Sequence, residues 1–370
     1  MVHALPGRRF VLTAMGVIKE LAYRLFVAAG VTSAAAWLNR RKAVILAYHD
    51  VYTSGPDPVA NYDGLRLRLA LFERQMRYMA THYEVVPLDE IRDLPAGSRH
   101  RRSLAAITFD DGYANFYRHA YPILRRLGLP ATVFVVTDFL VHGRPFWWDR
   151  LRAMIAATQR PSVRIDVDGI QQFPLATAQD KQTTLTDLSP RLLTLPPSRR
   201  EALLAGLAVD LDVDDQTPAI CGSLSADELR EMARDGISVG SHGRSHDSFL
   251  HLSRDALLAE LTESKRVLES VVGGPVTWLC YPHGEFSADA VEAAIRAGYR
   301  SAVTVIEGLH DPAADPYAVR RIGVNDHMTF AQFVVAASGL REMLKDLLRV
   351  RRQRRGEMRG QPTARIRGLG

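Results

Sequence analysis

A chain of 370 residues with 47% hydrophobic content can bury the core of one large barrel domain or of two smaller domains. Its formal net charge of +6 is concentrated at the ends: residues 1–42 hold seven Lys and Arg against one acid, and residues 341–370 hold ten against three. The remaining 30 basic and 37 acidic residues argue against a nucleic-acid-binding domain. Two cysteines exclude a disulfide framework.

Residues 1–42 predict a basic, amphipathic lead-in. Arg8-Arg9-Phe10 and the apolar residues after it resemble a secretory or twin-arginine signal, but Lys19 and Glu20 interrupt the apolar stretch. The later apolar run, residues 25–38, is too short for a normal spanning helix. We therefore expect a helix that lies on the domain or on a membrane, with basic ends that contact anionic lipid. This favours a cytoplasmic or peripherally membrane-associated protein, with export as the alternative.

From residue 43 the chain alternates between strands and helices. The expected strands are residues 43–48, 104–109, 131–136, 237–240, 276–280, 299–305 and 318–324. The expected helices are residues 69–81, 113–127, 253–272 and 287–297, with another that begins at the capping box of Ser225. Continuous apolar strands that alternate with helices predict an α/β protein built as a parallel β/α barrel.

Residues 140–222 interrupt this order and predict an inserted helical segment, with a short strand signal at 163–167. Segments of this length inside a domain are usually lids or extra subdomains. Trp147 and Trp148 at its start either pack the insertion onto the barrel or offer flat apolar faces to a ring-shaped substrate. At the other end, the basic tail 341–370 is expected to be disordered.

Asp110 and Asp111 directly follow the expected strand 104–109, and Gly112 allows a sharp turn after them. Adjacent carboxylates repel each other, so such a pair at a strand's end indicates a cation or a proton-transfer task. The alternative is a surface turn that caps the next helix.

His242 and His246 form a second motif at the end of the expected strand 237–240. Spaced four residues apart, they are expected on one side of a helical turn, where both imidazoles can bind one divalent ion. The carboxyl ends of parallel barrel strands meet at one edge, which brings this motif towards the two aspartates. Two imidazoles and one carboxylate leave coordination positions open, as in catalytic metal sites. Zinc suits this set best, while cobalt, nickel or iron also fit.

Three motifs in this order resemble the polysaccharide deacetylase family, which is carbohydrate esterase family 4 with its NodB homology domain. They are Thr108-Phe-Asp-Asp-Gly112, His242-x-x-x-His246 and Tyr281-Pro-His-Gly284, and the resemblance covers residues 43–340. It implies a distorted (β/α)7-type barrel and metal-dependent removal of acetyl groups from glycans. By position, it implies that Asp111, His242 and His246 hold the metal and that Asp110 is the general base. We also expect substrate contacts from Tyr281, Pro282, His283, Trp147 and Trp148.

Two positions depart from the family pattern. The family often has an arginine that steadies the catalytic aspartate where this chain has Cys280, so we expect Arg320 or Arg321 to take that role. The late Leu-x-x-His, which often donates the final proton, is also missing. His49, at the end of the first strand, is the expected replacement, although a structural His49 is an equal alternative. The late histidines His310 and His327 lie outside any such motif.

The resemblance therefore implies a metal-dependent hydrolase that removes N-acetyl groups from an N-acetylglucosamine-type glycan, such as a chitooligosaccharide or an exopolysaccharide. An O-acetyl esterase of the same fold is the first alternative, because the same oxyanion chemistry serves both bonds. An inactive glycan-binding module is the second, and only the missing arginine favours it. The expected partner is an N-acetylated glycan, with no role for nucleic acid.

Overall fold

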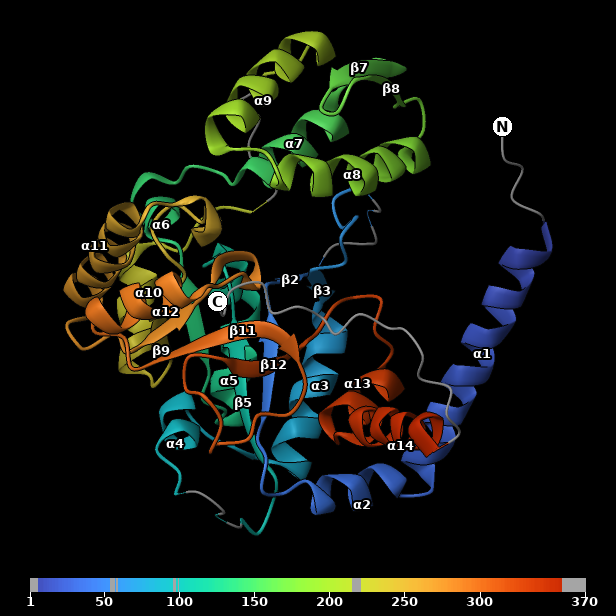
Figure 1. The fold of residues 1–370 in the computed structure, drawn as a ribbon, viewed down its shortest axis with the longest axis vertical. Helices are drawn as coiled ribbons and strands as arrows, with labels where there is room; N and C mark the ends of the chain where they lie inside the picture. The colour runs from blue at the N-terminus through green and yellow to red at the C-terminus, as the bar shows by residue number, and fades with distance from the viewer. Residues whose placement is uncertain are drawn as a thin grey trace.

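Seven parallel strands close into a barrel in the computed structural model, which describes residues 6–53, 57, 59–95, 98, 100–214 and 221–354 (Figure 1). The ring runs β1 (Val44–Tyr48), β12 (Val319–Gly323), β11 (Ser301–Glu307), β10 (Trp278–Cys280), β9 (Ser238–Ser241), β6 (Thr132–Val135) and β5 (Leu104–Phe109). Pairing of β5 with β1 closes it, and β4 (Glu84–Val85) adds to β5 outside the ring. The expected (β/α)7-type barrel is confirmed.

Burial explains why the strands follow this order. Every residue of β1, β5 and β6 is buried, as parallel strands covered on both faces require. The surrounding helices are α3 (Leu69–His82), α4 (Leu88–Arg92), α5 (Tyr121–Leu127), α6 (Thr137–His142), α10 (Ala226–Arg234), α11 (Arg254–Val272), α12 (Ala288–Arg296) and α13 (Phe330–Ala337). A short parallel pair, β2 (Asp50–Tyr52) and β3 (Arg66–Arg68), lies beside the end of β1.

Local signals set several helix ends as the sequence predicts. Ser225 and Glu228 form the capping box that begins α10. Gly128 ends α5 with a φ of 64°, a left-handed conformation that glycine adopts without a steric cost. The expected helix 113–127 is less regular than predicted, because Phe116–Ala120 forms a π-helical turn before α5.

The insertion is a small subdomain of mixed structure rather than a purely helical segment. It contains α7 (Trp147–Ala157), the antiparallel hairpin of β7 (Ser162–Asp166) and β8 (Ile170–Pro174), α8 (Ala178–Leu193) and α9 (Pro197–Leu211). Buried leucines and other apolar residues of these elements form a hydrophobic core separate from that of the barrel. The subdomain lies beyond one end of the barrel in Figure 1.

Helices also occupy both ends of the chain. α1 (Pro6–Ala28) and α2 (Val31–Leu38) precede the barrel and contact α13. The expectation of a disordered tail from residue 341 is wrong as far as Arg354, because α14 (Leu340–Arg354) is a helix whose Leu344 packs onto this group of helices. Residues 355–370 lie outside the described part of the chain.

Within the described residues, no single helix combines the length and the hydropathy of a membrane span. The pair Gly16–Ala28 and Val31–Leu38 meets that test only when taken together, and it bends by 73° at the break.

Candidate active site

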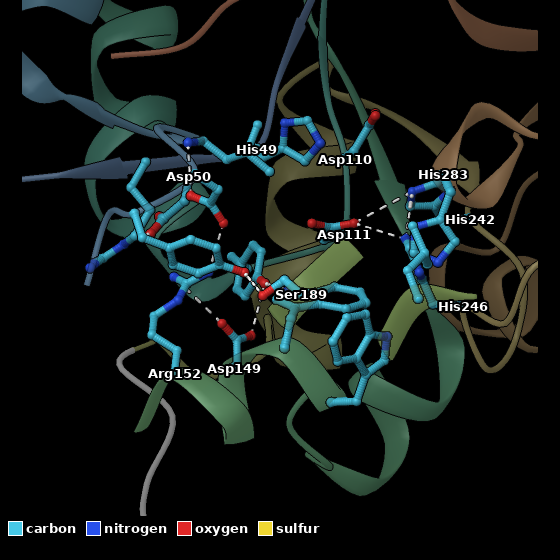
Figure 2. Close-up of a pocket in the computed structure, with 18 of the residues that line it drawn as sticks. His49, Asp50, Asp110, Asp111, Asp149, Arg152, Ser189, His242, His246 and His283 are labelled. Carbon is cyan, nitrogen blue, oxygen red and sulfur yellow. Dashed lines mark hydrogen bonds and ion pairs between the residues drawn. The ribbon is translucent and has the colours of Figure 1, made fainter. Parts of the chain in front are cut away.

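A cavity of ≈ 440 Å³ lies between the carboxyl ends of the barrel strands and the inserted subdomain. Its volume falls in the range of small-molecule binding sites. Figure 2 shows Asp110 and Asp111 on its barrel side, with His49 to one side of them and His242, His246 and His283 to the other. The inserted subdomain contributes the opposite wall, which includes Trp147, Trp148, Asp149, Arg152, Thr186, Ser189, Pro190 and Leu193.

Asp111, His242 and His246 bring three potential metal ligands together. Asp111 Oδ1 lies 3.4 Å from His242 Nε2 and 3.3 Å from His246 Nε2, and all three side chains are buried. The expected helical turn is wrong, because residues 242–248 form a loop in which His246 has a φ of 64°. The buried carboxylate of Glu260 on α11 shapes this loop by accepting hydrogen bonds from the backbone N–H groups of Arg244 and Ser245, both at 2.7 Å.

The donor atoms fit a divalent ion. His242 Nδ1 donates a hydrogen bond to the carbonyl oxygen of Cys280 at 2.8 Å, which leaves the lone pair of its Nε2 directed at the cluster. The Nε2 atoms of His242 and His246 lie 3.2 Å apart. Burial lowers the pKa of His246 and so favours the neutral imidazole that a metal requires. Burial alone would raise the pKa of Asp111, but hydrogen bonds from the two imidazoles lower it well below its usual value.

Asp110, His242 and Cys280 form a second group whose ligand atoms lie within 4.8 Å of one another, but this group suits a metal less well. Both carboxylate oxygens of Asp110 accept hydrogen bonds from the Arg321 guanidinium, at 2.7 and 2.8 Å. Burial also raises the pKa of the Cys280 thiol, which favours its protonated form. A cation here would lie beside a buried arginine, so the Asp111 cluster is the better site.

Arg321 on β12 is the arginine that steadies Asp110, whereas Arg320 is exposed. Arg321 is 2% exposed, and its Nη2 also lies 3.2 Å from Cys280 Sγ. Burial by itself would raise the pKa of Asp110, but the charge and hydrogen bonds of Arg321 hold that pKa below its ordinary value. Asp110 is therefore an ionised, oriented carboxylate adjacent in sequence to Asp111, one of the three potential metal ligands.

The similarity of this chain to known proteins agrees with this geometry. A polysaccharide deacetylase family model matches residues 97–160 and 207–302, which contain both aspartates and both cluster histidines. The chain belongs to the polysaccharide deacetylase family. YxkH of Bacillus subtilis (strain 168), a putative polysaccharide deacetylase, is 21% identical to this deacetylase over 303 residues, or 80% of this chain and 78% of that protein.

Two solved structures share the fold. The Streptococcus pyogenes deacetylase PplD, in complex with acetate, has a TM-score of 0.55 and 20% identity, covering 80% of this chain and 98% of its own. IcaB from Ammonifex degensii has a TM-score of 0.52 and 19% identity, covering 80% and 97%. Between its two matched stretches the family model leaves residues 161–206 unmatched, and these hold the hairpin, α8 and part of α9.

Four other histidines were named from the sequence, and they lie in different places. His49 lines the cavity, and its buried Nδ1 has no hydrogen-bond partner among the described residues. His283 also lines the cavity, with its ring centroid 4.6 Å from that of His246. His310 pairs with Ala43, just before β1, at the opposite end of the barrel, so it cannot serve this site. His327 lies over Gly64 and is not among the cavity-lining residues.

Four of the five expected substrate-binding residues line the cavity, and one does not. Trp147, Trp148, Tyr281 and His283 line the cavity, while Pro282 is buried and does not. Trp148 also packs onto the ring of Phe146, with centroids 4.4 Å apart, so it both anchors the insertion and faces the cavity.

A polar network on the insertion side escaped prediction from the sequence. Asp149 accepts a hydrogen bond from the Tyr113 hydroxyl at 2.8 Å, and that hydroxyl accepts one from Trp148 Nε1 at 3.0 Å. Arg152 pairs with Asp63 at 3.0 Å and so fixes the insertion to the loop after β2. Burial raises the pKa of Asp149 to about 6. These residues carry no motif, and only the approach of α7 to the barrel brings them together.

Proposed function

We propose that this deacetylase is a metal-dependent hydrolase that removes N-acetyl groups from an N-acetylglucosamine-type glycan, with zinc as the best-suited metal. The observation that supports it most strongly is the convergence of Asp111, His242 and His246 beside the Arg321-bound carboxylate of Asp110. A cavity with aromatic walls and hydrogen-bonding groups suits a sugar, which has apolar ring faces and a polar edge.

The chain's own groups supply the proton transfers. A divalent ion held by Asp111, His242 and His246 would polarise the acetyl carbonyl and lower the pKa of water. Asp110 accepts the proton of the attacking water, and Arg321 keeps this carboxylate ionised and correctly oriented beforehand. His49, across the aspartates from the cluster histidines, delivers a proton to the departing sugar amine.

His49 suits the proton donor better than His283 does. Burial, followed by the neighbouring His246, lowers the pKa of His283 to about 2, so its charged form is disfavoured. His49 is only half-buried and borders the cavity from the end of β1.

We expect His49→Ala to reduce turnover of N-acetyl glycans about 10²-fold or more, with metal content unchanged. Hydrolysis of nitrophenyl acetate should fall much less, because its good leaving group needs little protonation. Kinetics on both substrates, with the melting temperature, would measure the difference. His283→Ala is the matched comparison. Equal losses on both substrates together with a lowered melting temperature would assign His49 a structural role.

An O-acetyl esterase remains the second candidate, since the same groups can attack an ester. An inactive glycan-binding module was favoured only by the missing arginine of the motif, where this chain has Cys280. That argument no longer holds, because Arg321 binds Asp110 from β12.

The test incubates the purified protein with N-acetylglucosamine oligomers or with acetylated xylan, each with and without a chelator. We expect free amines and acetate from the oligomers, loss of activity with chelator, and recovery on adding zinc. Release of acetate from the xylan alone would favour the esterase. Elemental analysis should first verify that the chelator has removed the metal. Activity that persists in this metal-free protein would contradict metal dependence.

A further inference from the structure

Over residues 16–28 of α1, whose side chains the structure describes, the outward face is apolar, and no other described element covers it. Val17, Ile18, Leu21 and Leu25 are 54–68% exposed. Their spacing along the helix places all four on one face. Isolated exposed leucines are ordinary on protein surfaces, but four large aliphatic side chains on one helix face mark an interaction site.

The opposite face of α1 packs against the domain. Tyr23 and Phe26 pack against a small core formed by Ala35, Val335 and Leu340. Glu20 accepts a hydrogen bond from the Thr329 hydroxyl at 2.7 Å, which ties the helix to the beginning of α13. Because α1 is attached to the domain through this face, its apolar face is directed away from the barrel.

Exposed apolar side chains also occur on the two helices nearest to α1 in this corner of the molecule. Trp37 and Leu38 at the end of α2 are 59% and 60% exposed, and Leu347 and Leu348 of α14 are exposed nearby. α2 contacts both α1 and α14, and Figure 1 shows α2, α14 and the end of α1 at one corner of the molecule. More than half of the large exposed apolar side chains in the described chain belong to these three helices.

Basic side chains accompany this surface. Lys19 and Arg24 lie on α1, and Arg40, Arg41 and Lys42 directly follow α2. The guanidinium of Arg40 lies 4.2 Å from the ring of Trp37. A tryptophan beside basic residues at the edge of an apolar face is typical of the boundary between lipid headgroups and acyl chains.

We propose that α1 and α2 dock this deacetylase onto the surface of an anionic lipid bilayer, with the apolar face of α1 lying in the interface. Charge selects this occupant: a second copy of the chain would oppose the same basic side chains, whereas anionic headgroups complement them. A spanning arrangement would have to detach α1 and α2 from α13, with loss of the Glu20–Thr329 hydrogen bond and of the contacts made by the partly buried Tyr23 and Phe26. The proposal is independent of which glycan the site accepts.

Co-flotation of the full chain with vesicles tests this docking. We expect binding to phosphatidylcholine vesicles that contain phosphatidylglycerol, weak binding to phosphatidylcholine alone, and weakening by salt. Leu21→Glu with Leu25→Glu should reduce vesicle binding at least about tenfold, since two apolar contacts are replaced by charges that anionic lipid repels. Arg40→Glu with Arg41→Glu should reduce it about tenfold.

The matched controls lie on α12, across the barrel from α1 in Figure 1. Ile295 is 53% exposed and Arg296 is its exposed neighbour, so Ile295→Glu and Arg296→Glu should leave binding unchanged. Hydrolysis of nitrophenyl acetate by every variant verifies folding.

Four outcomes would overturn the proposal. The first is the absence of binding to any vesicle, and the second is binding that depends neither on lipid charge nor on the α1 substitutions. The third is a dimer, seen by light scattering without lipid, that Leu21→Glu with Leu25→Glu abolishes. The fourth is protein that only detergent can extract from the vesicles, which would show a spanning anchor.

Discussion

Asp110→Asn is expected to bind metal nearly as well as the unchanged deacetylase and to lose most turnover, on the order of 10²–10⁴-fold, as for a lost general base. Metal is retained because Asp111, not Asp110, faces the Nε2 atoms of His242 and His246. The amide introduced by this substitution would keep the shape of the side chain but cannot take the proton of the attacking water. Elemental analysis and single-turnover kinetics measure the two effects separately.

This substitution also weakens a buried ion pair, because Arg321 would face a neutral amide. We expect a stability cost on the order of 3 kcal/mol, so turnover must be measured well below the melting temperature. Asp149→Asn is the matched control, since Asp149 is an equally buried carboxylate in the same cavity. It should cost far less turnover, because Asp149 lies on the insertion wall opposite the cluster. Loss of metal from Asp110→Asn, with the fold intact, would make both aspartates ligands and refute the division of roles.

His242→Ala combined with His246→Ala should abolish metal binding and reduce turnover at least about 10³-fold. Only one ligand, Asp111, then remains of the three, and several kcal/mol of transition-state charge stabilisation are lost with the ion. The expected result is metal below one-tenth of the protein concentration by elemental analysis. Added zinc should not restore activity at concentrations that restore the chelator-treated, unchanged protein.

The control for this pair is His142→Ala with His251→Ala, two exposed histidines outside the cavity. It removes the same number of imidazoles and should keep both metal and turnover. Full metal retention in the His242 and His246 variant would move the metal site elsewhere. Retained turnover without metal would instead refute metal dependence.

The sequence by itself determined the barrel and the position of its site. Apolar strands and capped helices alternate in short local segments, and their periodicity depends on neighbouring residues only. Parallel strands bring their carboxyl ends to one edge, so motifs that follow β5 and β9 had to meet there. Asp110, Asp111, His242 and His246 could therefore be assigned to one site although more than a hundred residues separate the two pairs.

The local conformation of the histidine loop was less predictable. A spacing of four residues suits a helical turn, but the amides of Arg244 and Ser245 bind Glu260 of α11 instead and hold the loop in another shape. The tail was misjudged for a related reason. Its charge indicates disorder, yet Leu344 packs against the core beside α2 and stabilises the helix as far as Arg354.

Only the tertiary structure decided which arginine holds Asp110. Arg320 and Arg321 are neighbours on β12, and side chains alternate between the two faces of a strand, so the register of the barrel directs Arg321 inwards and leaves Arg320 exposed. The network of Asp149, Arg152 and Asp63 likewise depends on how the insertion approaches the barrel. Such contacts join segments far apart in the chain, and no local pattern in the sequence encodes their distance or direction.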